Sequence, residues 1–150
     1  MSYAYRRHLP HYQNDFRTYF VTFVTRGRKV LPGRARDIVL ARIVNSPLAY
    51  LHVAVVMPDH VHLLATPTWD KSHMSHPIAE IVRRIKGASA REVNLAFGTT
   101  GPLWQEESFD HQLRNDESLI QKADYIANNP VRKGLVARPE DYPWLWRRTS

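Results

Sequence analysis

Two apolar segments separated by a tight turn constrain the fold of this chain most strongly. Residues 49–57 (AYLHVAVVM) and 60–66 (HVHLLAT) are rich in β-branched and aliphatic side chains, and only Pro58 and Asp59 lie between them. Two such runs joined by so short a connection predict a β-hairpin. The remaining elements must therefore pack on a sheet that contains this hairpin.

The other patterns predict two further strands and three helices. Strands are expected at residues 18–25 (TYFVTFVT) and, more weakly, at 103–113. Helices are expected at residues 34–45, after an N-cap at Ser75, and at 116–128, where Pro130 should end the helix. The order β-α-β-β-α-β-α predicts an α+β fold, a ferredoxin-like antiparallel sheet with helices packed mainly on one face. We expect one domain over residues 1–150.

Charge and cysteine content narrow the function. The chain has 21 Lys and Arg against 14 Asp and Glu, a formal charge of +7, and no cysteine. The lack of cysteine excludes a disulfide scaffold, a thiolate zinc site and a cysteine nucleophile. The basic excess favours a polyanionic partner, although a merely solvated basic surface is the alternative. No apolar run approaches the roughly 18 residues of a membrane span, so we expect no membrane partner and a cytoplasmic location.

The densest chemical signal is the pair His60 and His62. Residues two apart on a strand point to the same face, so both imidazoles should lie side by side while Val61 faces the other way. Such a pair can chelate one divalent ion, or it can simply form hydrogen bonds on an exposed sheet face. Because cysteine is absent, the remaining ligands would be oxygen donors, which suits Mg²⁺ or Mn²⁺.

A second signal lies in the last predicted helix, DESLIQKADYIANNP. Its buried stripe consists of Leu119, Ala123, Ile126 and Ala127, and Tyr125 lies off that stripe. Asn129, four residues further on, should stand on the same side if the helix continues. A surface tyrosine beside a helix end is the competing interpretation, since residue type alone cannot choose among the 7 tyrosines.

Several basic and aromatic residues favour nucleic-acid binding, but they do not indicate which reaction the protein catalyses. Arg83 and Arg84 fall on the side of the second helix away from its apolar stripe, and Lys86 lies at the edge of that stripe. Four aromatic residues are candidates for base stacking or, alternatively, for ordinary packing: Trp104, Phe109, Trp144 and Trp146. No phosphate-cradling glycine motif is present, so a nucleotide cofactor is not expected.

Four stretches, in this order, resemble the HUH-type single-tyrosine transposases, and in particular the REP-associated tyrosine transposases of bacteria. They are VVMPDHVHLL, IVRRIKGAS, LWQEESFDHQLRNDE and DYIANNPVRKGLV, which lie within residues 16–136. A His-hydrophobic-His triplet alone is a weak signal, whereas its combination with the other three stretches is specific.

The resemblance implies a metal-dependent enzyme that nicks and rejoins single-stranded DNA at hairpin, REP-like palindromic sites. His60 and His62 would hold the metal, and Tyr125 would be the catalytic nucleophile that becomes linked to the 5′ phosphate. Asn129 stands where mobile members of the family commonly carry a glutamine as third metal ligand. Phosphate contacts would come from Arg83, Arg84, Lys86, Arg132 and Lys133.

Two other functions and the assembly state stay open from sequence. A histidine-triad nucleotide hydrolase also carries His-hydrophobic-His on a strand, but its third histidine is replaced here by Leu64. A module that binds hairpin nucleic acid without cutting it is the second alternative. A homodimer is also open, because in some relatives the tyrosine helix completes the partner's site while in others one chain suffices.

Overall fold

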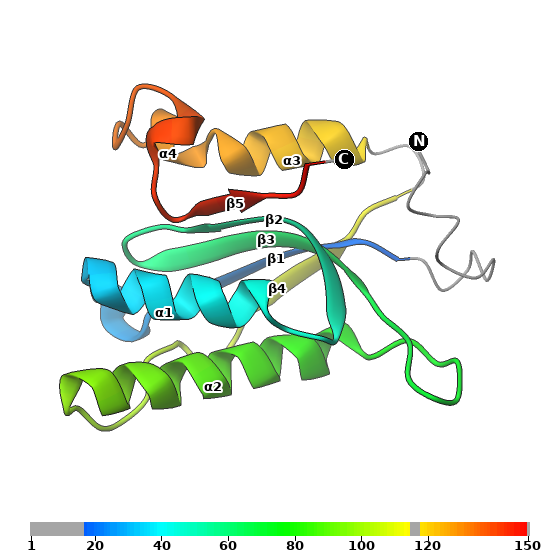
Figure 1. Cartoon of the computed structure of the whole chain (residues 1–150), viewed down its shortest axis with the longest axis horizontal. Coiled ribbons are helices and arrows are strands. Elements are labelled where there is room, and N and C mark those ends of the chain that lie inside the picture. Colours follow the sequence, from blue (N-terminus) through cyan, green and yellow to red (C-terminus); the bar gives the residue numbers. More distant parts are fainter. Residues whose placement is uncertain (1–16, 115–117, 150) are drawn as a thin grey trace.

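The computed structural model describes residues 17–114 and 118–149 (Figure 1). Its strands are β1 (Tyr19–Val24), β2 (Ala49–Val56), β3 (His60–Pro67), β4 (Phe109–Gln112) and β5 (Leu145–Arg147). Its α-helices are α1 (Gly33–Val44), α2 (Ile78–Phe97), α3 (Leu119–Ala127) and α4 (Asn129–Arg132). Two 3₁₀ turns, η3 (Arg26–Arg28) and η4 (Pro139–Asp141), complete the described elements.

The strands form one sheet in the order β4-β1-β3-β2-β5, and all neighbours are antiparallel. The first four strands have the ferredoxin-like arrangement that the sequence predicts. The predicted hairpin is β2 and β3, closed at its turn by the bond from the Met57 amide to the His60 carbonyl. The three-residue strand β5 was not predicted, because so short an edge strand has no periodic signal of its own.

The two long helices cover one face of the sheet (Figure 1). Apolar residues of α1 and α2, among them Val39 and Ile85, are buried against Phe23 of β1 and against Val61 and Leu63 of β3. These positions alternate along each strand, as a period of two residues requires. This larger core therefore lies between the sheet and the two helices, which are below the sheet in the view of Figure 1.

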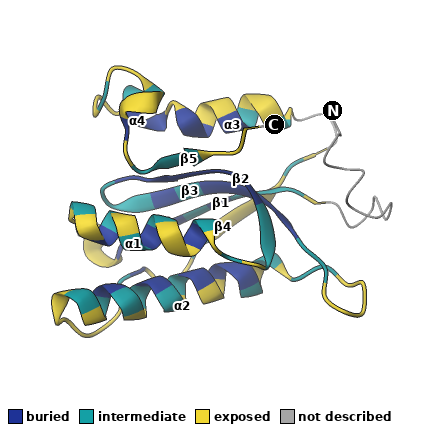
Figure 2. Cartoon of the chain, viewed as in Figure 1, coloured by how far each residue is buried: buried dark blue, intermediate teal, exposed yellow. Residues whose placement is uncertain are grey.

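The third helix, α3, lies on the opposite face. Its buried residues Ala123 and Ile126 pack with Val53 and Val55 of β2 and with Leu64 of β3 in a second, smaller core. Figure 2 shows the exposed outer side of α3 and the buried residues beneath it. The helices are thus mainly on one face, as predicted, while the predicted buried stripe of α3 covers part of the other.

Two helix boundaries differ from the predicted ones. The N-cap of α2 is Pro77, whereas Ser75 pairs in an isolated bridge with Trp69. The predicted start of the third helix at Asp116 lies outside the described residues, and α3 begins after Ser118, whose hydroxyl accepts from the Gln121 amide. Pro130 does not end helical structure altogether, because it occupies the first turn of α4, where a missing N–H costs nothing.

Within the described residues, no helix has both the length and the apolar character needed to span a bilayer.

Candidate functional site

The two histidines of β3 lie side by side on the α3 face of the sheet. Val61 and Leu63 are buried in the core beneath α1 and α2, so strand alternation turns His60 and His62 to the other face. Their ring centroids are 4.8 Å apart with an interplanar angle of 73°. The predicted pairing of the two imidazoles on one face is therefore confirmed.

One nitrogen of each ring is held by a neighbouring side chain. Asp59 Oδ1 lies 2.7 Å from His60 Nδ1, and Thr22 Oγ1 of β1 lies 2.8 Å from His62 Nδ1. Asp59 is itself paired with Arg28 at 3.1 Å. Bonds of this kind fix the orientation of a ligating imidazole. Among the described residues, no hydrogen bond occupies the Nε2 atom of either ring.

Burial keeps His62 neutral. Burial is the main cause that lowers the pKa of His62 to about 4. The charges of His60, Arg132 and Lys133 lower this pKa as well. A neutral imidazole has a free lone pair, which metal coordination requires. The charges of Arg132 and Lys133 also show that the segment after α3 lies within electrostatic reach of the histidine pair.

Tyr125 lies on the exposed side of α3, with 52% of its surface accessible. Its ring lies between two cations, with the guanidinium of Arg132 3.9 Å and the ammonium of Lys122 5.6 Å from the ring centroid. Lys122 also lies 5.3 Å from the ring of Phe20, which in turn is 5.5 Å from the ring of His62. A short series of side-chain contacts thus joins Tyr125 to the histidine pair on the same face.

Asn129 is the first residue of α4, directly after the break between the two helices at Asn128. Its side chain is 4% exposed, its Oδ1 atom is 3.4 Å from an Arg132 nitrogen, and its Nδ2 atom is buried without a partner. The α-helix does not continue to Asn129, because α3 ends at Ala127. The unpaired Nδ2 atom is a donor that an acceptor such as a phosphate oxygen would satisfy, whereas only the Oδ1 atom could ligate a metal.

These residues fit a divalent metal. A mixed nitrogen and oxygen donor set, which suits Mg²⁺ or Mn²⁺, would consist of the two imidazole Nε2 atoms, free of hydrogen bonds among the described residues, and the Asn129 Oδ1 atom. No group of three His, Asp or Glu side chains able to hold a metal occurs among residues 17–114 and 118–149. Within these residues, the candidates for a further ligand are therefore an amide or a backbone carbonyl, besides water and substrate.

Tyr142, the other tyrosine near this face, is unsuited to attack a substrate. It is 5% exposed, and its hydroxyl donates to the Val56 carbonyl at 2.6 Å. Burial also raises the pKa of its phenol. Of these two tyrosines, Tyr125 is the one whose phenol is accessible.

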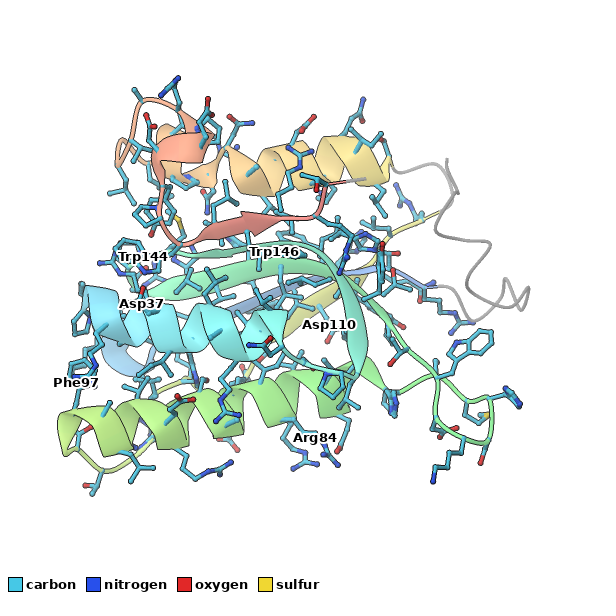
Figure 3. The ribbon with its side chains drawn as sticks, viewed as in Figure 1. Asp37, Arg84, Phe97, Asp110, Trp144 and Trp146 are labelled. Atoms are coloured by element: carbon cyan, nitrogen blue, oxygen red, sulfur yellow. The ribbon has the colours of Figure 1, made fainter. Side chains whose placement is uncertain are left out.

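The predicted phosphate contacts fall into two groups. Arg132 and Lys133 are exposed on the site's side of the sheet, and Arg132 also donates to the Tyr125 carbonyl at 2.7 Å. Arg83 and Arg84 lie on α2, across the sheet from the histidines, and both pair with Glu80 at 2.6 Å. Figure 3 shows Arg84 directed away from the sheet.

Lys86 is engaged within the protein. Its ammonium donates to the carbonyls of Gln105 and Glu106 at 2.8 and 3.1 Å and to the Ser108 hydroxyl at 2.8 Å. These three bonds use all three donors of the ammonium group. Lys86 therefore connects α2 to the segment before β4 and has no free donor for a phosphate. The sequence alone could not show this, because the partners lie about 20 residues further along the chain.

A comparison with known families matches most of the chain. A family model described as "Transposase IS200 like" matches residues 14–129. The chain belongs to the IS200-like transposase family.

Two curated relatives are described as REP-associated tyrosine transposases. The chain is 32% identical over 91 residues to a REP-associated tyrosine transposase of Escherichia coli and 28% identical over 94 residues to a candidate REP-associated tyrosine transposase of Haemophilus influenzae. These alignments cover 60% and 59% of this chain and 49% and 53% of the relatives, so the chain spans about half the length of the curated relatives it matches.

A solved structure shares the fold. The REP-associated tyrosine transposase bound to a REP hairpin superposes with a TM-score of 0.66 at 25% identity, covering 86% of this chain and 75% of that one. The resemblance inferred from the four sequence stretches is confirmed by these relatives.

Sequence reasoning missed the residues that support the candidate site. Thr22 and Phe20 of β1 contact His62, and Lys122 joins Phe20 to Tyr125. The alternation of residues 18–25 places Phe20 and Thr22 on one face, but the register between β1 and β3 is needed to bring them to His62. Only the paired sheet supplies that register.

We expect the free energy of unfolding of this protein to fall as the pH drops from about 6.5 to about 4. The folded state keeps His52 and His62 neutral, because burial lowers the pKa of each to about 4, whereas the unfolded chain takes up both protons near the ordinary value of 6.5. Within this window, each histidine should lower the free energy of unfolding by up to about 1.4 kcal/mol for every pH unit that the pH falls. Urea unfolding at several pH values in this window measures the free energy of unfolding. In the His62→Gln variant this free energy should depend less steeply on pH than in the wild type. An unchanged slope in that variant would contradict it.

Proposed function

We propose that this chain is a metal-dependent transposase that nicks and rejoins single-stranded DNA beside a hairpin, through a 5′-phosphotyrosine intermediate. One observation carries the proposal: an exposed tyrosine and two histidines with unpaired Nε2 atoms face the same side of one sheet. A nucleophile and a metal-binding pair in this arrangement are what phosphoryl transfer to a tyrosine requires.

The histidine pair would hold Mg²⁺ or Mn²⁺, with Asn129 as the candidate for a third ligand. When bound, the ion would polarise the scissile phosphate as a Lewis acid. Asp59 and Thr22 would keep the two imidazoles oriented through their Nδ1 atoms. Burial of His62 would keep it unprotonated at neutral pH and so able to ligate.

Tyr125 would supply the attacking oxygen. Its Oη atom forms a bond to phosphorus, the bond from phosphorus to the 3′ oxygen breaks, the phenol loses its proton and the released 3′ hydroxyl gains one. Because the phosphotyrosine retains the energy of the phosphodiester, a second strand end can reverse the reaction without a nucleotide cofactor. Arg132 would orient this tyrosine, since it contacts both the ring and the backbone carbonyl of Tyr125.

The substrate would be a hairpin with single-stranded flanks. The similar solved transposase is bound to a REP hairpin, and the motifs of this chain favour the same branch. Arg132 and Lys133 would contact phosphates near the nick, while Arg83 and Arg84 could only meet DNA that passes the α2 side of the molecule. Because α3 packs on β2 of its own chain, we infer that one chain can complete its site. DNA repeats as the substrate imply a cytoplasmic location.

Replacing Tyr125 by Phe should abolish the covalent adduct, because the change removes only the attacking oxygen. The probe is a hairpin oligonucleotide with randomised single-stranded flanks, labelled at its 3′ end, since a 5′-phosphotyrosine retains that end of the DNA. We expect the wild type to give a labelled protein band on a denaturing gel. Tyr142→Phe is the matched control: it should retain the adduct while losing about 1 kcal/mol of stability. An adduct in Tyr125→Phe would assign the nucleophile elsewhere.

Replacing His60 or His62 by Ala should abolish nicking while leaving hairpin binding largely intact, because affinity rests mainly on phosphate contacts. EDTA should have the same effect on the wild type, and added Mn²⁺ should restore it. His76→Ala, in the segment before α2, is the control and should nick normally. Full nicking in EDTA would refute the metal dependence, and binding without any nick in the wild type would favour a binding module.

The salt dependence of hairpin binding should separate the two groups of basic residues. Removing both Arg132 and Lys133 should reduce the slope of log K against log salt by roughly one to two units, at about 0.7 per phosphate contact on single strands. Removing Arg83 and Arg84 should produce the same reduction only if DNA also follows α2. An unchanged slope for Arg132→Ala with Lys133→Ala would show that these side chains are merely solvated.

A further inference from the structure

The structure separates the four aromatic residues that could stack on bases. Trp104 is buried at 4% exposure, with its indole N–H donating to the Ser89 hydroxyl at 3.0 Å. Trp144 donates to Asp37 at 2.7 Å, and Trp144 and Trp146 both pack against the larger core (Figure 3). Phe109 is different, because it is 69% exposed on the edge strand β4.

The register of the sheet places Phe109 on the face of the histidine pair. Thr22 of β1 lies opposite both His62 of β3 and Phe109 of β4. Directly opposed residues on antiparallel strands point to the same face, and the Thr22 hydroxyl contacts His62 there. The adjacent Asp110 lines the groove beside α2 on the other face, as alternation requires. Phe109 therefore belongs to a row His62, Thr22, Phe109 across one face.

The exposed ring is held by a well-anchored segment. Trp104 pairs in a bridge with Thr25, and the Gln105 amide donates to the Val24 carbonyl at 2.8 Å. Lys86 donates to the carbonyls of Gln105 and Glu106 and to the Ser108 hydroxyl immediately before Phe109. The backbone that carries this exposed apolar side chain is thus anchored rather than part of a free loop. An anchored backbone loses little conformational entropy when the ring binds a partner.

We infer that Phe109 is a stacking platform for a base of the single strand next to the cleaved phosphate. The inference rests on the proposed function, because it places the scissile phosphate at His60 and His62. Two strand spacings separate His62 from Phe109, about 10 Å between backbones. A strand whose phosphate is at the histidines can therefore place a nearby base over the ring. The cations Lys122, Arg132 and Lys133 on the same side suit its backbone.

The experiment uses 2-aminopurine, a base whose fluorescence falls when it stacks on an aromatic ring. The probes are the hairpin oligonucleotides selected by the adduct assay, or otherwise by binding, each with one 2-aminopurine at successive flanking positions. Binding is measured in EDTA, so that no cleavage occurs. We expect quenching at one or two adjacent positions with the wild type and its loss in Phe109→Ala. Phe109→Trp should retain the quenching.

Phe97→Ala is the matched control, because Phe97 is an exposed phenylalanine at the end of α2 on the other face (Figure 3). Loss of one stacked base should weaken binding roughly 5- to 150-fold in Phe109→Ala, and the control should bind like the wild type. Urea unfolding should give similar midpoints for Phe109→Ala and the wild type, since the lost side chain is exposed.

The outcomes are separable. Position-specific quenching that depends on Phe109 supports the platform, even if the wild type fails to nick, in which case only the proposed catalysis is lost. Nicking by the wild type without such quenching, or equal quenching in Phe109→Ala, overturns the platform and leaves the proposed function standing. A change in oligomeric state on sedimentation of Phe109→Ala, with unchanged DNA affinity, would show instead that the ring covers a second copy of the chain.

Discussion

The alternation of side chains along β3 is the constraint on which the rest of the molecule depends. Val61, Leu63 and Ala65 are buried in the core under α1 and α2, so His60 and His62 must face the other side. A slip of one residue would move every side chain of the strand to the opposite face. Since each buried aliphatic side chain contributes roughly 1.5–3 kcal/mol, the core fixes the register and with it the position of both imidazoles.

The second determinant is the junction between α3 and α4. The chain breaks at Asn128, Pro130 begins a new helical turn, and Arg132 folds back on Tyr125. Because the tyrosine carbonyl is satisfied by that guanidinium, the last turn of α3 stays ordered despite the proline. The same few residues therefore hold an exposed phenol, a buried amide and a basic pair on the face that carries the histidines.

Local patterns in the sequence account for the hairpin, the facing of His60 and His62, and the exposure of Tyr125, since each depends on residue spacing within one element. They do not account for β5, for the contact of Thr22 with His62, or for the three bonds of Lys86, because these join residues far apart in the chain. Trp104 and Phe109 could not be told apart from sequence, since both stand near one another in a single weak strand pattern and differ only in tertiary surroundings.

The register shift in β2 has a consequence for chain length. His52 is an extra residue between Leu51 and Val53, so that Leu51 faces the larger core while Val53 faces the smaller one. Deleting His52 would leave Leu51 opposite Ala65 and Val53 opposite Leu64, so simple alternation would be restored and residues 49–51 would keep their present face. The half of the hairpin that leads into the turn and the histidines would keep its pairing. A change of chain length at this point of the sheet would therefore leave the positions of His60 and His62 unchanged.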